Sequence, residues 1–236
     1  MRGPYEAKLL STMLPTKYSL NMVPMDGTIR DTISKEVNSS GASIFVTGFI
    51  KAGLAHGNSE EAETLGSTED LSMRDIHVPS LIVKKPIANN DSRYFVLLTN
   101  GSTSCWRGYL LATTLIKPRD QIVVGHFYKD GHGEQDELDD FMKMESVKAR
   151  YERDFLDRGL NGTFVGVAQD AAAHPGNTFK VALEQISEFL RDHNPDFLII
   201  CPRPGIAADK ATWKISLTES IIKTINCNMI VCKSTS

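Results

Sequence analysis

Four cysteines are the residues of this 236-residue chain whose types most readily do chemistry. Cys105, Cys201, Cys227 and Cys232 form no C-x-x-C pair, and the last two do not have the spacing of a zinc knuckle. All four lie beside or within apolar segments. Small thiols in that setting are typical of buried positions in a protein of a reducing compartment. The sequence therefore predicts free, buried cysteines and no metal site.

Two histidines are candidates for catalysis or metal binding. His126 lies in a segment typical of a strand, with neither an Asp/Ser/His pattern nor metal-ligand spacing around it, so a core histidine is favoured. His132 lies in Asp-Gly-His-Gly-Glu-Gln-Asp, which lacks the ligand spacing of an EF-hand and is predicted to be a surface loop. The chain has no nucleophile–base pair and no G-x-S-x-G elbow. We therefore predict that the protein is not an enzyme.

Three further features have both a structural and a functional interpretation. Arg203 follows a predicted strand and could meet a phosphate, although a solvated loop residue is favoured. Trp106 and Trp213 follow strand ends and are expected to fill the core or a pocket, with an interface anchor as the alternative. The charged segment 134–158 is expected to be a helix with one buried stripe, and a docking surface is its alternative role.

The composition excludes several classes of protein. The chain is 41% hydrophobic and 23% charged, which is ordinary for a globular domain, and its formal net charge of −3 argues against a strongly basic nucleic-acid binder. No apolar run reaches the roughly 18 residues of a membrane span. No signal peptide is recognisable in the first ten residues, so we expect a cytoplasmic location.

The elements that must position these residues alternate between strand-like and helix-like segments in the second half of the chain. The expected strands are residues 94–99, 121–128, 163–168, 196–201 and 228–232. The expected helices are residues 106–115, 134–158, 178–193 and 216–225. Apolar strands separated by helices of this length imply βαβ crossovers and a parallel sheet covered on both faces.

The first half of the chain carries a shorter form of the same pattern. Strands are expected at residues 19–23, 42–47 and 80–84, and helices at residues 26–37 and 67–74, with a Gly-rich loop over residues 48–64. Residues 19–49 correspond to 163–203, and residues 65–85 to 214–234, which indicates an internal repeat whose first copy lacks two strands. We predict a partial domain over residues 1–86, a linker over 87–91 and a complete domain over 92–236.

Taken in order, these segments resemble a tandem universal stress protein. The matching motifs include a first strand followed by Asn100, Gly101 and Ser102, a second strand containing His126, and a final strand that reads Asn-Met-Ile-Val from residue 228. The resemblance implies an α/β, flavodoxin-like, doubly wound fold, with one complete five-stranded parallel sheet in the order 3-2-1-4-5 and a partial second copy.

The resemblance also implies where a nucleotide would bind. ATP-binding members have the pattern Gly-x2-Gly-x9-Gly-Ser/Thr, which brings backbone amides close to phosphates. In the second copy Cys201, Pro204 and Ile215 replace the glycines, and in the first copy Lys51 replaces the middle one. Proline has no N–H, and a β-branched side chain obstructs a phosphate. A vestigial or weak nucleotide site is expected at Gly48, Gly66 and Ser67 in the first copy and at Asn100, Gly101, Ser102, Arg203 and Ser216 in the second.

These departures predict a non-catalytic interaction or scaffold module without a cofactor. The alternative is a stress-response regulator that binds ATP or another nucleotide weakly, and a hydrolase or transferase on the same fold is the least favoured. Family members pair their final strands antiparallel, which implies an intramolecular pseudo-dimer in this chain. Its expected interface residues are Leu81, Ile82, Val83, Met229, Ile230 and Val231.

The expected partner is a protein or a larger assembly, and neither nucleic acid nor a membrane. The side of the first copy that lacks two strands is the candidate surface for that partner, because open sheet edges and apolar patches favour association. A cytoskeletal association is suggested only by analogy with degenerate modules in large assemblies.

Overall fold

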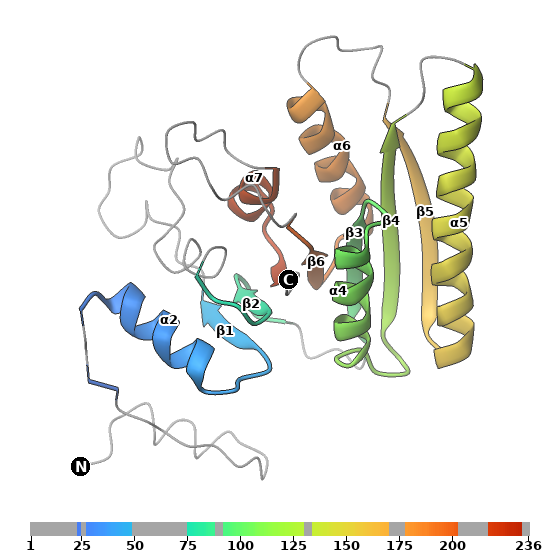
Figure 1. Ribbon diagram of the computed structural model, residues 1–236. Helices are drawn as coiled ribbons and strands as arrows, with labels where there is room; N and C mark the ends of the chain where they lie inside the picture. Colours follow the sequence, from blue (N-terminus) through green and yellow to red (C-terminus); the bar gives the residue numbers. More distant parts are fainter. Residues whose placement is uncertain are drawn as a thin grey trace.

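The computed structural model describes residues 23–24, 27–48, 75–87, 92–129, 134–169, 178–202 and 217–232. A seven-stranded sheet in the order β1-β2-β7-β6-β3-β4-β5 forms its centre (Figure 1). The strands are β1 (Phe45–Gly48), β2 (Ser80–Val83), β3 (Tyr94–Thr99), β4 (Gln121–Lys129), β5 (Asn161–Gln169), β6 (Phe197–Ile200) and β7 (Asn228–Val231). The helices are α2 (Ile29–Ser39), α4 (Thr103–Thr113), α5 (Glu134–Arg158), α6 (Thr178–His193) and α7 (Leu217–Thr224).

The five strands β3 to β7 form the predicted parallel sheet. Strand β3 pairs with both β4 and β6, β4 pairs with β5, and β6 pairs with β7, all in parallel. In chain order this is 3-2-1-4-5, so the predicted doubly wound topology is confirmed. Parallel strands that are each followed by a helix must be joined by right-handed crossovers, and this rule leaves few strand orders possible.

Helices cover both faces of this sheet. On one face, Phe189 of α6 and Ile222 of α7 pack with Leu198 of β6. On the other face, Tyr109 of α4 and Tyr151 of α5 belong to a second buried cluster with the remaining inward side chains of the strands. Every residue of β6 and of β7 is buried, which explains why these strands read as continuous apolar runs rather than alternating ones.

Strand β2 joins this sheet antiparallel to β7. Leu81 lies opposite Ile230, with Ser80 opposite Val231 and Ile82 opposite Met229. The antiparallel ladder expected between these two strands is therefore present. Strand β1 then pairs in parallel with β2, so β1 and β2 extend the sheet formed by the rest of the chain rather than forming one of their own.

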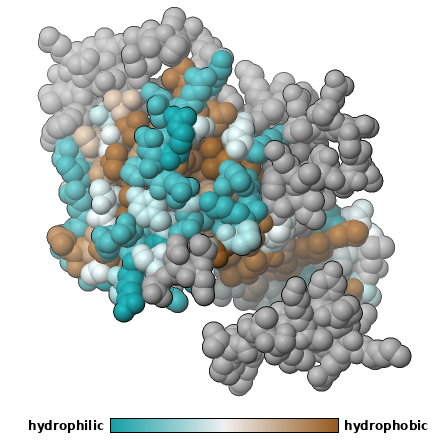
Figure 2. Space-filling view, turned by 180° about the vertical axis from the view of Figure 1, so that it is seen from behind, coloured by the Kyte–Doolittle hydropathy of each residue, from teal (hydrophilic) through white to brown (hydrophobic). Residues whose placement is uncertain are grey.

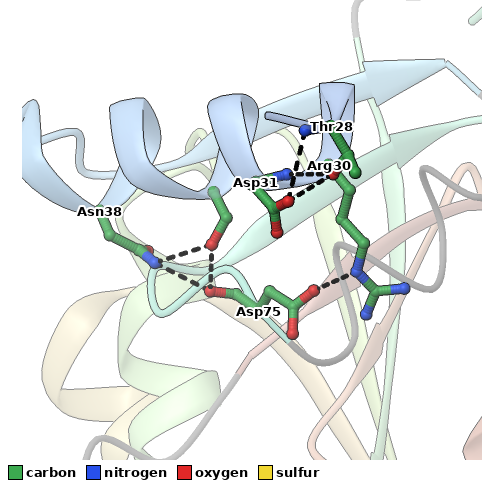
Figure 3. A network of polar contacts seen from close by, with 6 residues as sticks. Thr28, Arg30, Asp31, Asn38 and Asp75 are labelled. Carbon is green, nitrogen blue, oxygen red and sulfur yellow. Dashed lines mark hydrogen bonds and ion pairs between the residues drawn. The ribbon is translucent and has the colours of Figure 1, made fainter. Parts of the chain in front are cut away.

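Helix α2 begins at a capping box, and Figure 3 shows how polar contacts hold it near β2. The Thr28 Oγ1 accepts from the Asp31 N–H at 3.1 Å, and the Asp31 carboxylate accepts from Thr28 in return. Arg30 donates to the Asp75 carboxylate, and the Asn38 amide donates to the Asp75 carbonyl at 2.8 Å. These contacts fix the helix to the segment that precedes β2.

Some expectations need correction or fall outside the described residues. Helix α4 begins at Thr103 rather than at residue 106, because Ser102 is its N-cap. Of the expected strand 19–23, only Val23 is among the described residues, and it is not in a strand. The expected helix 67–74, the loop beyond Gly48 and residues 1–18 lie outside the described residues. Among the described helices, none combines the length and the apolar character that crossing a membrane requires.

Candidate functional site

The turn after β3 is the part of the expected nucleotide site that the structure describes best. Gly101 has a φ of +76°, a left-handed conformation that favours glycine. The Gly101 N–H donates to the Thr99 hydroxyl at 3.0 Å, and the Ser102 N–H donates to the Asn100 Oδ1 at 3.1 Å. The Cys105 N–H donates to the Ser102 Oγ at 3.4 Å. These three backbone donors at the start of α4 are thus bonded to side chains of the turn itself.

The same turn packs closely against α5 and β4. A Cβ added to Gly101 would lie 2.8 Å from Val147 Cγ2 and 3.6 Å from His126 Cε1. His126 is buried, and its Nδ1 lies 3.1 Å from the Thr99 carbonyl oxygen. Burial lowers the pKa of His126, which favours the neutral imidazole. The expected core histidine is therefore confirmed, and its ring closes one side of the turn.

Aromatic side chains fill the space between α4 and α5 beside this turn. The ring centroid of Trp106 lies 5.1 Å from that of Tyr109 and 5.2 Å from that of Tyr151, and the Arg150 guanidinium lies 3.9 Å from the Trp106 centroid. The Tyr109 hydroxyl donates to Asp154 at 2.7 Å. Burial, with Asp154 beside it, raises the pKa of Tyr109. Trp106 thus packs between two helices, as expected of a space-filling residue.

Three of the four cysteines converge at the carboxyl ends of β6 and β7. Cys201 follows β6, Cys232 follows β7, and Cys105 lies in the first turn of α4. All three are free thiols, and both of the other thiols lie near enough to Cys201 to raise its pKa. The contact with Cys201 is the largest of the influences that lower the pKa of Cys105 to about 5. We call Cys105, Cys201 and Cys232 the thiol cluster.

The thiol cluster is a feature that the sequence analysis missed. The sequence analysis predicted buried cysteines but not their grouping, and the exposed fractions of Cys105 and Cys232 are both 3%. The available signal was that Cys201 and Cys232 directly follow two strands that become neighbours in a 3-2-1-4-5 sheet. Within the described part of the chain, no three His, Cys, Asp or Glu side chains are arranged to hold a metal ion.

The described residues of the two expected nucleotide sites, one in each predicted copy, lie at opposite ends of the sheet. Asn100, Gly101 and Ser102 lie at the carboxyl end of β3, but Gly48 ends β1, whose direction is opposite because β2 runs antiparallel to β7. Gly48 therefore belongs to the other end of the sheet, where an added Cβ would meet nothing within 4 Å. The remaining predicted residues, Gly66, Ser67, Arg203 and Ser216, lie outside the described residues.

Comparison with known proteins places this architecture among solved structures. No family model matches the sequence, and no curated protein matches it. A protein from Pseudomonas aeruginosa UCBPP-PA14 that is assigned to the universal stress proteins matches with a TM-score of 0.59 at 12% identity, covering 89% of this chain and 69% of its own. A universal stress protein from Archaeoglobus fulgidus DSM 4304 matches with a TM-score of 0.56 at 16% identity, covering 87% of this chain and 65% of its own.

The chain has the fold of the universal stress proteins. A protein of unknown function from Pseudomonas aeruginosa PAO1 also shares it, with a TM-score of 0.53 at 11% identity over 89% of this chain and 69% of its own. Sequence identities this low describe the fold alone. The universal stress protein fold nevertheless agrees with the resemblance seen in the motifs, and it identifies the carboxyl ends of β3 and β6 as the place to examine for a site.

Proposed function

We propose that this protein is a non-catalytic interaction or scaffold module of the universal stress protein type, with a degenerate nucleotide site. The observation that carries the proposal is the turn after β3. There the N–H groups of Gly101, Ser102 and Cys105 are already bonded to side chains of the turn. Free N–H groups at the start of a helix are what a phosphate would need. A nucleotide would have to break these bonds, so binding at this turn is weak or absent.

The register of the sheet supports a tandem origin of the module. The sequence alignment makes Leu81 the counterpart of Ile230, and Val46 the counterpart of Ile199. Val46 pairs with Leu81, just as Ile199 pairs with Ile230. Leu81 also lies opposite Ile230, its own counterpart, which is the register of a two-fold axis passing through this pair. We infer that residues 1–86 and 92–236 are related halves of an intramolecular pseudo-dimer.

The edge of the sheet at β1 is the proposed surface for a protein partner. Val46 of β1 is 55% exposed, and Val83 at the end of β2 is 38% exposed. Figure 2 shows a hydrophobic strip over this part of the molecule. An edge strand offers backbone donors and acceptors to another chain, and apolar side chains beside it favour association.

Nucleotide titration tests the proposal most directly. The thermal stability of the full chain is measured with ATP, ADP and AMP, each with and without Mg²⁺, and a flat response is expected. A ligand present at 100 times its dissociation constant would instead add about 2.7 kcal/mol to the free energy of unfolding. Such a stabilisation would contradict the degenerate site and favour a nucleotide-binding regulator.

A weak nucleotide binder is the second candidate function, and Gly48 is the observation that favours it. No atom of the described residues lies within 4 Å of a Cβ added at this glycine, so they leave room for a ligand to approach the backbone at the end of β1. If ATP stabilises the chain, Gly48→Val should abolish the effect, whereas Gly159→Ala, at a turn after α5, should retain it. Loss of stabilisation in both variants would argue against a site at Gly48.

A photo-crosslinking amino acid tests the partner surface. It is placed at Val46 in one protein and at Leu156 in another, since Leu156 is 83% exposed on α5. The proposal expects a specific protein adduct from position 46 that position 156 does not give. Equal labelling from the two positions would show that exposure alone explains the adducts.

A further inference from the structure

We propose that Cys105 and Cys201 are an oxidisable dithiol, in which hydrogen peroxide drives formation of a reversible disulfide beside the third thiol, Cys232. The inference rests on how the fold brings three thiols to one place. It does not depend on whether the neighbouring site binds a nucleotide.

The sheet places two of the thiols on the same face. Strands β6 and β7 are parallel neighbours, and the Cys232 N–H donates to the Ile200 carbonyl at 2.9 Å, which continues the ladder beyond the strand ends. Side chains two residues apart along a strand share a face. Cys201 therefore follows Ile199, and Cys232 follows Ile230, toward the helix α4 side of the sheet, where both cysteines join the same buried cluster as Tyr109.

Gly108 on α4 is what lets the helix approach these thiols. A Cβ added at this glycine would lie 2.4 Å from the Cys201 Sγ and 3.4 Å from the Cys232 Sγ, so both sulfurs lie against the same point of the helix backbone. Cys105 is one turn earlier on the same helix, near enough to Cys201 for each thiol to shift the pKa of the other. A disulfide needs the two sulfurs to approach to about 2 Å. Rotation of the Cys105 and Cys201 side chains toward each other could bring the sulfurs together without moving α4 or β6.

The surroundings of the two thiols give them different roles. The nearby Cys201 thiol, with Ser102 at the start of α4, outweighs burial and lowers the pKa of Cys105 to about 5. As a thiol, Cys105 donates to the Asn100 Oδ1 at 3.3 Å, a contact that favours the protonated form. The pKa of Cys201 is raised, chiefly by the same contact with Cys105. Cys105 is thus the attacking thiolate, and Cys201 keeps its proton until the second step.

The chemistry balances with peroxide as the only oxidant. The Cys105 thiolate attacks one oxygen of hydrogen peroxide, the O–O bond breaks, and the leaving hydroxide takes a proton from solvent to form water. Cys105 is then a sulfenic acid. The Cys201 sulfur attacks the Cys105 sulfur, the S–O bond breaks, and the departing hydroxyl leaves as water with the proton of Cys201. Two electrons pass from two thiols to one peroxide, which ends as two waters, and a dithiol reductant reverses the change.

Burial determines which oxidants can react. Cys105 is 3% exposed, whereas Cys201 is only partly buried. Hydrogen peroxide is close to water in size, so it is the class of oxidant that suits this site, and a bulky alkylating reagent should react slowly with the folded protein. The absence of a metal arrangement among the described His, Cys, Asp and Glu residues favours a disulfide over a soft-metal site.

Peptide mapping of the full-length chain tests the proposal without any substitution. The protein is treated with peroxide, its remaining thiols are blocked under denaturing conditions, and it is digested with trypsin. Trypsin leaves Cys105, Cys201 and Cys232 on three different peptides. We expect a linked pair carrying Cys105 and Cys201 that disappears on reduction with dithiothreitol. Only unlinked peptides, or a link confined to Cys201 and Cys232, would overturn the proposal.

Serine variants assign the roles of the two cysteines. Cys201→Ser should leave Cys105 as a sulfenic acid that a dimedone probe traps, and Cys105→Ser should abolish both the link and the probe labelling. Cys227→Ser is the matched control, because Cys227 is equally buried but lies before β7, and the Cys105–Cys201 link should form in this variant as in the unmodified chain. Sulfenic acid at Cys227, or a link that needs Cys227, would contradict the assignment. If Cys105→Ser fails to fold, the peptide map of the unmodified chain still decides the question.

Discussion

The side-chain oxygen of Asn228 accepts a hydrogen bond from the backbone N–H of Lys84 at 2.9 Å. It also accepts from the N–H of Lys85 at 3.1 Å, so one buried amide in β7 holds the chain where it leaves β2. The Lys84 ammonium in turn donates to the Ile225 carbonyl at 2.8 Å, at the end of α7. We call the antiparallel pairing of β2 with β7 the seam. Polar contacts stabilise the seam at one end, and apolar packing stabilises its centre.

Asn228→Ala should weaken this seam. The substitution leaves two backbone N–H groups without their acceptor in a mostly buried position, which costs about 1–3 kcal/mol of unfolding free energy. Urea unfolding of the full chain measures the loss. Asn226→Ala is the control, because Asn226 is exposed two residues earlier and should change stability by less than about 0.5 kcal/mol. Equal effects of the two substitutions would show that the contacts of Asn228 do not stabilise the seam.

The position of the seam was predictable because two kinds of information agreed. The apolar segments around Leu81 and Ile230 read as strands, and the predicted repeat makes them counterparts, so the resemblance implied an antiparallel pair. In the ladder Leu81 lies opposite Ile230, its counterpart in the alignment, and the pairs on either side are those that a two-fold axis through this pair requires. The polar locks were not predictable, because the contact of Asn228 with Lys84 joins residues 144 positions apart and leaves no periodic signal in the sequence.

The thiol cluster could be predicted only in part from the sequence. The order of the strands brings Cys201 and Cys232 together, and this much could have been read from the predicted topology. The arrival of Cys105 depends on how closely α4 approaches the sheet, which Gly108 decides. The two copies were expected to carry separate vestigial nucleotide sites, and the antiparallel pairing of β2 with β7 puts Gly48 and Gly101 at opposite ends of the sheet.

Gly108→Ala should destabilise the protein. The new Cβ would lie 2.4 Å from the Cys201 Sγ and 3.0 Å from the Cys232 Cβ, so α4 or the strand ends must move. Overpacking of this kind typically costs about 1–3 kcal/mol. Gly48→Ala is the matched control, because its Cβ would meet nothing within 4 Å and should be nearly neutral. A Gly108→Ala protein as stable as the control would mean that the thiol cluster can rearrange freely.

Asp120 supports the start of β3 and the turn before β4. Its carboxylate is 1% exposed and accepts from the Arg93 N–H and the Lys117 N–H, each at 2.8 Å. Asp120→Ala should therefore lower the free energy of unfolding by about 1–3 kcal/mol, because two partly buried N–H groups lose their buried acceptor. Asp157→Ala is the comparison, since that side chain is 68% exposed on α5 and its removal should matter little. Thermal unfolding of both variants distinguishes a buried acceptor from a surface charge.

Cys227 predicts a stability change at alkaline pH. Burial raises its pKa from the ordinary 9.0 to about 11, with Lys84 and Lys85 opposing the shift. Above pH 9 the unfolded chain loses this proton while the folded chain keeps it, so the unfolding free energy falls as the pH rises and levels off above 11. The loss attributable to Cys227 is about 2 to 3 kcal/mol, at 1.36 kcal/mol per pKa unit. Urea unfolding is measured at pH 8.5, 9.5 and 10.5, and the unfolding free energy of Cys227→Ser should fall less steeply with pH than that of the unmodified chain. The tyrosines and the other thiols contribute equally to the pH dependence of the two proteins. Parallel declines in the two proteins would rule out Cys227 as the source.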